Sequence, residues 1–197
     1  MKYTQVAADA FQKLQLNAGI MLTDFDPSDG SYDREDIFAA TGGGVSFEAV
    51  PEFLDFGEDI DNIPANTKEL KRLDYFTCTM SGTMRTVDTT TAKALIGPAD
   101  VASKKVTPRV DLLQTDFFDV WWVGDYSDVN ADSGQTTKAG FLAIKLINAL
   151  STGGFTIQSN DKGKGDFDFE FTGHYSLNNI DVVPFEIYIG EGVAAQG

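Results

Sequence analysis

A run of acidic and polar residues near the N-terminal end has the composition of a calcium-binding loop. Its oxygen-bearing residues fall at the first, third, fifth and twelfth positions of the EF-hand pattern: Asp24, Asp26, Ser28 and Glu35. The sixth position, where the sharp turn requires glycine, holds Asp29, and no helix is predicted on either side. We therefore interpret this segment as an ordinary acidic loop.

Two other segments suggest ligand chemistry without completing a motif. Residues 128–134 repeat the acidic spacing but lack the closing glutamate that a calcium loop needs. The triple glycine at 42–44 is not followed by Lys-Ser or Lys-Thr, so it does not form a phosphate-binding loop. A tight bend or local flexibility explains the glycines, and we assign no metal and no cofactor to either segment.

His174 and Cys78 are the only histidine and the only cysteine of the chain. One residue of each type cannot complete a zinc site, and no disulfide can form within the chain. No nucleophile-elbow motif accompanies the histidine. We interpret His174 as a strand residue and Cys78 as a small residue of the core.

The most regularly spaced carboxylates are Asp166, Asp168 and Glu170. Residues two apart point to the same face of a strand, whereas a glycosidase needs two carboxylates that face each other across a cleft. A solvated strand face fits this spacing better. We therefore assign no catalytic, cofactor-binding or metal-binding residue, and we expect the chain not to be an enzyme.

The chain carries 30 acidic and 15 basic residues, for a net charge of −15. This charge excludes a protein that coats DNA, because such binding neutralises phosphates with Lys and Arg. An acidic surface would instead repel DNA, although solubility alone also explains the charge. Residues 65–110 hold 8 bases and 4 acids, between two acidic flanks. We expect Lys104 and Lys105 to meet an acidic flank of a neighbouring copy.

Apolar residues predict strands along most of the chain. The clearest pattern is at 167–172, where phenylalanines alternate with carboxylates and should face inward. The predicted strands are 19–25, 45–56, 70–84, 117–126, 141–147, 155–157, 167–172 and 183–189. The run at 45–56 is either two short strands or one strand with a bulge near Pro51. Periodicity alone does not distinguish 141–147 from a buried helix.

One helix is well marked. Asp88 can serve as its N-cap, residues 89–96 form its body, and Gly97 followed by Pro98 ends it. Residues 4–16 have a helical spacing too, with an N-terminal arm over about 1–17 as the alternative. The remaining segments are predicted to be a link at 98–109, long loops at 26–44, 57–68 and 126–139, and a small-residue tail at 190–197.

These elements predict a mainly β fold, namely a β-sandwich or barrel-like pair of sheets with one flanking α-helix and extended arms and loops. A chain of 197 residues suits a single domain over its whole length. The N-terminus has no signal-peptide pattern, and no apolar run is long enough for a transmembrane helix. We therefore expect no membrane partner.

The order of these elements resembles that of the major tail protein, or tail tube protein, of long-tailed, non-contractile bacteriophages. The similarity covers most of the chain and includes the closing pattern GKGDFDFEFTGHYS…VPFEIYI at 163–176 and 183–189. The resemblance implies hexameric rings whose strands join into an inner barrel and which stack into a hollow tube that conducts DNA. It also implies that arms and a long loop lock successive rings, with no cofactor and no catalytic residue.

The same resemblance implies the partners and the location. The partners would be further copies of the chain, a tape-measure protein, and tail terminator and initiator proteins. The location would be the virion tail, after assembly in the host bacterial cytoplasm. DNA would pass through an acidic lumen without specific binding, and the carboxylates of 166–172 or 45–56 could line that lumen.

Two alternatives remain open. One is the inner tube of a contractile tail or of a phage-like bacteriocin, which a companion sheath gene would reveal. The other is a carbohydrate-binding β-sandwich that does not assemble. That module needs an exposed aromatic platform, and Trp121, Trp122 and Tyr126 are the only cluster that could form one.

Overall fold

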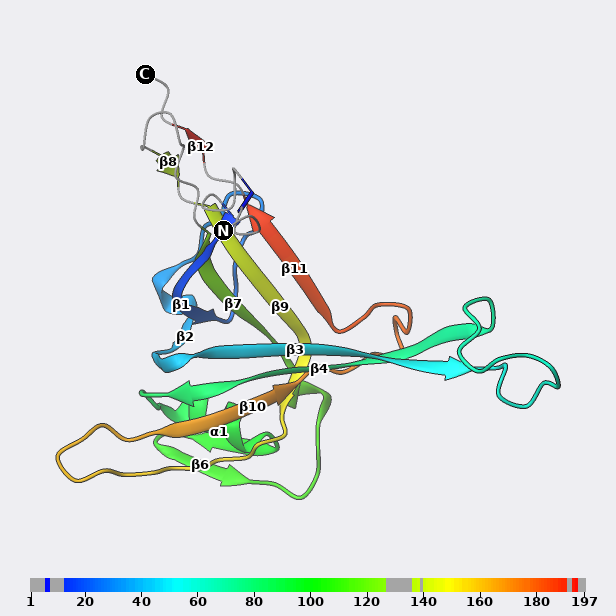
Figure 1. The fold of residues 1–197 in the computed structure, drawn as a ribbon. Helices are drawn as coiled ribbons and strands as arrows, with labels where there is room; N and C mark the ends of the chain where they lie inside the picture. The colour runs from blue at the N-terminus through cyan, green and yellow to red at the C-terminus, as the bar shows by residue number, and fades with distance from the viewer. Residues whose placement is uncertain (1–5, 8–12, 127–135, 139, 191–192, 195–197) are drawn as a thin grey trace.

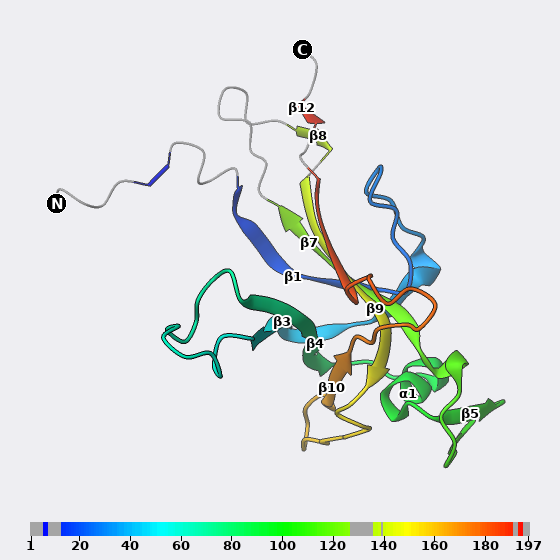
Figure 2. The same cartoon turned by 90° about the vertical axis from the view of Figure 1, so that its right-hand side faces the viewer.

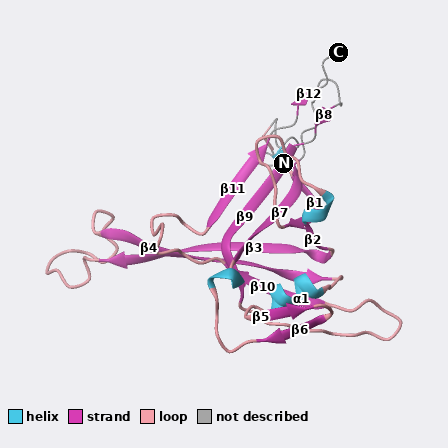
Figure 3. Cartoon of the chain, turned by 180° about the vertical axis from the view of Figure 1, so that it is seen from behind, coloured by secondary structure: helices cyan, strands magenta, loops and turns pink. Residues whose placement is uncertain are grey.

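The protein is mainly β (Figure 3). The described part of the chain contains one α-helix, and short 3-10 helices at Arg34–Asp36 and Gln114–Asp116. The computed structural model describes residues 6–7, 13–126, 136–138, 140–190 and 193–194. The fold class predicted from the sequence, a β-sandwich with one helix beside it, is confirmed.

Eight antiparallel strands form the main sheet, in the order β2-β1-β7-β9-β10-β4-β3, with β11 also paired to β9. Their bounds are β1 Gln15–Leu22, β2 Ile37–Ala39, β3 Thr41–Asp55, β4 Lys71–Met84, β7 Phe118–Tyr126, β9 Gly140–Ser151, β10 Phe167–Thr172 and β11 Phe185–Gly190. A separate short pair joins β8 (Thr136–Lys138) to β12 (Val193–Ala194).

Strand β9 divides the sheet into two layers (Figure 1). Its first part pairs with β7 and β11, whereas Leu150 and Ser151 at its end pair with β10. We call β2, β1, β7, β9 and β11 the first layer and β10, β4 and β3 the second layer. The sandwich therefore forms by one sheet folding over on a shared strand.

The main core fills the space between the two layers. Strands β4 and β10 contribute its fully or nearly fully buried side chains from one side, including Cys78, Met80 and Phe171. Phe171 packs edge-to-face against Phe118 and Phe38, with ring centroids 5.5 and 6.0 Å apart. Because each such side chain contributes roughly 1.5–3 kcal/mol when buried, the inward-facing aromatics of β10 hold the layers together.

The helix α1 (Thr89–Ile96) has the predicted bounds. The Asp88 side chain accepts a 2.8 Å hydrogen bond from the Thr91 backbone N–H, and Gly97 ends the helix at a positive φ of 83°. The predicted link at 98–109 is wrong, because the segment forms a hairpin of β5 (Ala99–Ala102) and β6 (Lys105–Pro108). The turn of this hairpin requires Ser103 to adopt a positive φ of 57°. Serine rarely has a positive φ, so the sequence does not predict this turn.

Strand boundaries differ from the prediction mainly because some strands continue beyond their predicted ends. Strand β3 is one continuous strand with a register shift between Glu52 and Phe53, so the single-strand alternative was correct. It also takes in the triple glycine, where Gly43 and Gly44 have positive φ and lie outside the register between Gly42 and Val45. The 26–44 loop is therefore shorter than predicted.

Strand β1 begins at Gln15, which places the end of the predicted N-terminal helix or arm inside a strand. The rest of that segment lies mostly outside the described residues. The strand predicted at 155–157 is absent, and only Gln158 bridges to Asp166 there. These residues have no neighbouring strand to complete a ladder, and Phe155 instead packs its ring against Phe167 at 6.0 Å.

Candidate functional site

The outer face of the second layer is lined by hydroxyl and carboxyl groups. Residues that are paired on neighbouring strands lie side by side and point to the same face of the sheet. The residues of β3, β4 and β10 on this face therefore form rows across the layer. One row joins Glu48, Thr79 and Thr172, and the next joins Ser46, Ser81 and Glu170. We call this the polar face, and its members are Ser46, Glu48, Thr79, Ser81, Thr83, Thr152, Asp168, Glu170 and Thr172.

Threonine hydroxyls fix the carboxylates of the polar face. Thr83 Oγ1 donates a 2.9 Å hydrogen bond to Asp168 Oδ1, and Thr152 Oγ1 donates one of 2.9 Å to Glu170 Oε1. None of the nine members is Lys or Arg. At the end of the face, Arg85 forms an ion pair with Asp166. The face is therefore acidic and hydrogen-bonded within itself, a surface that repels polyanions.

The carboxylate faces predicted separately on 166–172 and 45–56 belong to this one surface. Strand β4 lies between β10 and β3, so Asp168 and Glu170 are carried on the same side of the layer as Glu48. Sequence alternation predicted the face of each strand. It did not predict that the carboxylates of β3 and β10 lie on the same side of the second layer, because that depends on the register of β4 with both of its neighbours.

Strand β3 leaves this layer open at its edge. It is 15 residues long and ends the strand order, with β4 as its sole strand partner in the described part of the chain. An edge of this length presents unpaired backbone N–H and C=O groups, which can pair with a strand of another chain. Pro51 and the two register shifts of β3 interrupt that edge locally.

The hairpin of β3 and β4 projects beyond the rest of the fold (Figure 2). We call residues 50–76 the arm. Its side chains are exposed on both faces of a two-stranded ribbon, with Phe53 and Leu73 paired across it and 51% and 49% exposed. A two-stranded ribbon is marginally stable alone, and exposed apolar clusters mark contact surfaces. The sequence contained a signal for this, because apolar residues occupy both alternating faces of 50–56.

Asp55 organises the tip of the arm. Its Oδ1 accepts a 2.9 Å hydrogen bond from the Gly57 N–H, and its Oδ2 accepts one of 2.7 Å from the Asn66 N–H. These backbone hydrogen bonds lower the pKa of the Asp55 carboxyl. Lys71 lies over the Phe53 ring, 5.1 Å from its centroid, and also donates to Asn66.

The predicted calcium-like loop is held by its own carboxylates. Asp26 Oδ1 accepts from the Ser28 N–H at 2.8 Å, and Asp29 Oδ1 accepts from the Ser31 N–H at 2.9 Å. In the part of the chain that the structure describes, no three His, Cys, Asp or Glu side chains come together in a group that could hold a metal ion. The segment 128–134 lies outside the described residues.

His174 follows the end of β10 and is not a strand residue, contrary to the prediction. Its Nδ1 lies 3.2 Å from the Asn148 carbonyl oxygen, so this nitrogen carries the proton, and its ring packs edge-to-face on Phe117 at 5.2 Å. It borders a cavity of about 440 Å³ with Asn148, Tyr175 and other polar residues. Cys78 is fully buried in β4, as predicted.

The aromatic cluster proposed as a platform is mostly enclosed. Trp121 and Trp122 are only 5% and 8% exposed. Trp122 Nε1 donates a 3.0 Å hydrogen bond to the Ala18 carbonyl, and Trp121 packs edge-to-face against Phe25 at 5.5 Å. The Tyr126 side chain lies outside the described part. The two tryptophans therefore present no open surface for a sugar ring.

No protein-family model matches this chain, and no curated protein matches it. Among the described helices, none has the length and apolar character needed to cross a membrane.

Proposed function

We propose that this chain is a structural virion protein that forms hexameric rings stacked into the hollow tail tube of a long-tailed, non-contractile bacteriophage. The polar face is the observation that carries the proposal. It lies on a layer whose opposite side is buried by the first layer and whose long edge strand is open. Copies joined along such edges would extend the layer into a closed barrel with the polar face toward the bore.

The chemistry of the polar face suits the passage of DNA. Glu48, Asp168 and Glu170 would repel phosphates along the bore. The other side chains of the polar face carry neutral hydroxyl groups, so the face has no positive charge to which a phosphate could bind. A net charge of −15 adds to that repulsion. In this proposal DNA passes without specific binding, and the chain performs no catalysis and needs no cofactor.

The partners in this proposal are the chain itself, a tape-measure protein inside the tube, and terminator and initiator proteins at its ends. The location is the virion tail, after assembly in the host cytoplasm. The six-fold ring follows from the resemblance in element order. The inner tube of a contractile tail or of a phage-like bacteriocin would use the same surfaces, and a neighbouring sheath gene would favour it.

A carbohydrate-binding module is supported less well. Its platform would need open aromatic rings, and both tryptophans of the candidate cluster are buried. The most exposed aromatic residues of the arm, Phe53 and Phe56, have no polar group to orient a sugar. Tyr75, the exposed tyrosine of the arm, is a single ring and does not make a platform.

Electron microscopy of the concentrated and aged protein, with size-exclusion profiles, tests the proposal. We expect hollow rings or tubes. Tubes of the variant Glu48→Lys with Glu170→Lys should retain a DNA oligonucleotide in the bore and protect it from nuclease, whereas wild-type tubes should not. Nuclease-sensitive binding would place these residues outside the bore and contradict the proposal. A persistent monomer that binds a glycan array would replace it with the carbohydrate-binding module.

A further inference from the structure

The cavity of about 440 Å³ beside His174 is lined by rings and side-chain amides. Its walls come from residues 114–117, from β9 and from the loop that follows β10. None of its lining residues is Lys, Arg, Asp or Glu. We call this cavity the amide pocket. Its ring-bearing and amide-bearing residues are Phe117, His174, Tyr175, Gln114, Asn148 and Asn178.

A β-bulge in β9 shapes one wall of the amide pocket. Ile147 and Asn148 together oppose Asp119, where the register of β7 and β9 shifts. Asn148 has a positive φ of 49°, and its N–H donates a 3.0 Å hydrogen bond to Asp119 Oδ1. A bulge re-aims a side chain, and bulges occur often beside binding and active sites. Here the bulge turns the Asn148 side chain out of the strand ladder and toward His174.

Asn148 and His174 hold each other through two hydrogen bonds. Asn148 Nδ2 donates to the His174 carbonyl oxygen at 3.1 Å, and His174 Nδ1 donates to the Asn148 carbonyl oxygen at 3.2 Å. Phe117 packs edge-to-face on the imidazole, with ring centroids 5.2 Å apart. Since Nδ1 carries the proton, the neutral imidazole presents Nε2 as an acceptor. The pocket therefore has a fixed ring and a fixed acceptor before any ligand binds, which lowers the cost of binding.

Two other side-chain amides of the pocket are available to a ligand. Among the residues that the structure describes, none makes a hydrogen bond to the side chain of Gln114 or Asn178. The position of Asn178 is fixed by its backbone N–H, which donates to Ser176 Oγ at 3.3 Å. A carboxamide sets a donor beside an acceptor, so it forms paired hydrogen bonds with adenine, which presents the same two groups side by side. Aromatic rings add stacking on the face of the base.

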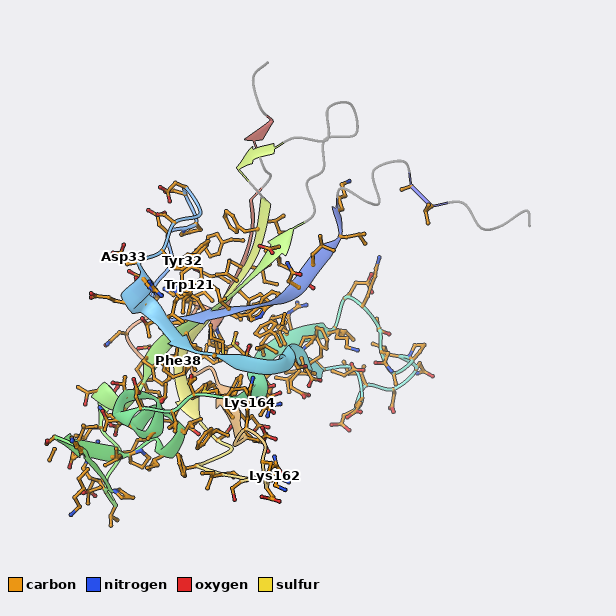
Figure 4. The ribbon with its side chains drawn as sticks, turned by 90° about the vertical axis from the view of Figure 1, so that its left-hand side faces the viewer. Tyr32, Asp33, Phe38, Trp121, Lys162 and Lys164 are labelled. Carbon is orange, nitrogen blue, oxygen red and sulfur yellow. The ribbon has the colours of Figure 1, made fainter. Side chains whose placement is uncertain are left out.

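The charges of the chain disfavour a phosphorylated ligand in the amide pocket. No cation lines the pocket, a carboxylate, Asp119, supports its bulge, and the whole chain carries a net charge of −15. Lys162 and Lys164, labelled in Figure 4, lie on the loop before β10, which projects to the opposite side of the molecule from the loop after β10 (Figure 1). A phosphate would therefore be repelled with no cation to offset the repulsion.

We propose that the amide pocket binds an uncharged adenine nucleoside, adenosine. The side-chain amides of Gln114 and Asn178 pair with the two edges of the base on which the amino group stands beside a ring nitrogen. The base stacks on the aromatic rings of the pocket, and His174 Nε2 accepts a hydrogen bond from a ribose hydroxyl. This site goes beyond the proposed tail-tube role and does not depend on it, because all of its residues belong to one chain.

Saturation-transfer NMR with adenosine tests the site on unassembled and assembled protein alike. We expect saturation of the base protons and, in unassembled protein, a saturable shift of the His174 Hε1 signal, which is unambiguous in a chain with one histidine. Gln114→Leu and Asn178→Leu should each weaken binding about tenfold, because each removes one paired contact with the base. Thr115→Leu and Asn179→Leu are the matched controls. They change neighbouring residues that do not line the pocket and should leave binding unchanged.

The choice of ligand tests the assigned chemistry. Adenosine monophosphate should bind about tenfold more weakly than adenosine at low salt, and the difference should shrink as salt rises. Equal binding of the two would overturn the preference for an uncharged ligand. Absence of adenosine binding, or binding that survives both Gln114→Leu and Asn178→Leu, would overturn the site. Binding of methyl glucoside in place of adenosine would overturn the assigned ligand class. Both substituted positions are exposed, so circular dichroism spectra should match those of the wild type.

Discussion

The Tyr175 hydroxyl accepts a 2.9 Å hydrogen bond from the backbone N–H of Phe76. This bond lies where β4 loses its second neighbour, because β10 pairs with β4 only from Thr79 to Met84. Beyond that point β4 has β3 as its sole strand partner in the described chain. One side chain from the loop after β10 therefore secures the base of the arm to the sandwich.

Replacing Tyr175 with Phe should loosen the base of the arm. The change removes the hydroxyl and leaves the Phe76 amide without this partner, at a cost of about 1 kcal/mol, or about fivefold faster local exchange. Hydrogen–deuterium exchange at Phe76 measures the effect. Tyr188→Phe is the matched control, since its hydroxyl bonds only the exposed Glu186. Unchanged exchange at Phe76 would show that the hydroxyl does not hold the arm.

The arm tip should open in acid. Hydrogen bonds from the Gly57 and Asn66 amides lower the folded-state pKa of Asp55, below the ordinary value of about 3.9. A carboxyl group whose pKa is lower in the folded state than in the unfolded state stabilises the fold at a pH above its unfolded-state pKa. This stabilisation is lost as the pH falls through the folded-state pKa. We therefore expect both amides to lose exchange protection below about pH 4.

Asp55→Ala should remove that protection already at neutral pH and abolish its acid dependence. Asp59→Ala, in the same tip, is the control and should leave both amides protected. Equal protection of Gly57 and Asn66 in wild type and in Asp55→Ala would contradict the assigned role of this carboxylate.

Much of the fold could be predicted because local patterns agreed with the tertiary contacts. Alternation identified the buried side of β10, and the sequence Asp88 to Pro98 identified α1 because the cap and the stop are local chemistry. The hairpin of β5 and β6 could not be predicted, since it depends on packing against α1 and on a serine in a left-handed conformation.

The candidate surfaces were only partly predictable for the same reason. The sequence assigned the carboxylates of β3 and of β10 each to one face of its own strand. It could not predict that both sets lie on the same side of the layer, because that depends on how each strand is paired with β4. The strands of the arm were predicted within 45–56 and 70–84, with the loop 57–68 between them, but their pairing into a projecting hairpin was not. The apolar residues Phe53 and Leu54 on opposite faces already indicated that this ribbon lacks a covered side.

Cys78 should be almost inert to thiol reagents in the native protein. Burial raises the pKa of its thiol to about 11, so the reactive thiolate is scarce at pH 8. Labelling by a water-soluble disulfide reagent should follow the unfolding rate and rise sharply in urea. Phe56→Cys supplies the control, because a thiol at the exposed arm tip should react at once. Rapid labelling of wild-type protein would mean that β4 opens locally.

Asp116 should matter far more for stability than Asp100, although both pair with Arg109. The Asp116 side chain is fully buried and also accepts a 2.9 Å hydrogen bond from the Leu113 N–H. Asp116→Ala leaves a largely buried guanidinium without its inner partner, which costs about 3 kcal/mol. Asp100 is 67% exposed, so Asp100→Ala should cost less than about 1 kcal/mol.

Urea denaturation followed by tryptophan fluorescence measures both losses in the free energy of unfolding. Arg109→Met combined with Asp116→Leu should recover most of the loss, because replacing both members of a buried pair by apolar residues removes the unpaired charge. Similar losses for Asp116→Ala and Asp100→Ala would mean that solvent reaches the guanidinium. In that case the ion pair would not anchor the segment that carries Val110.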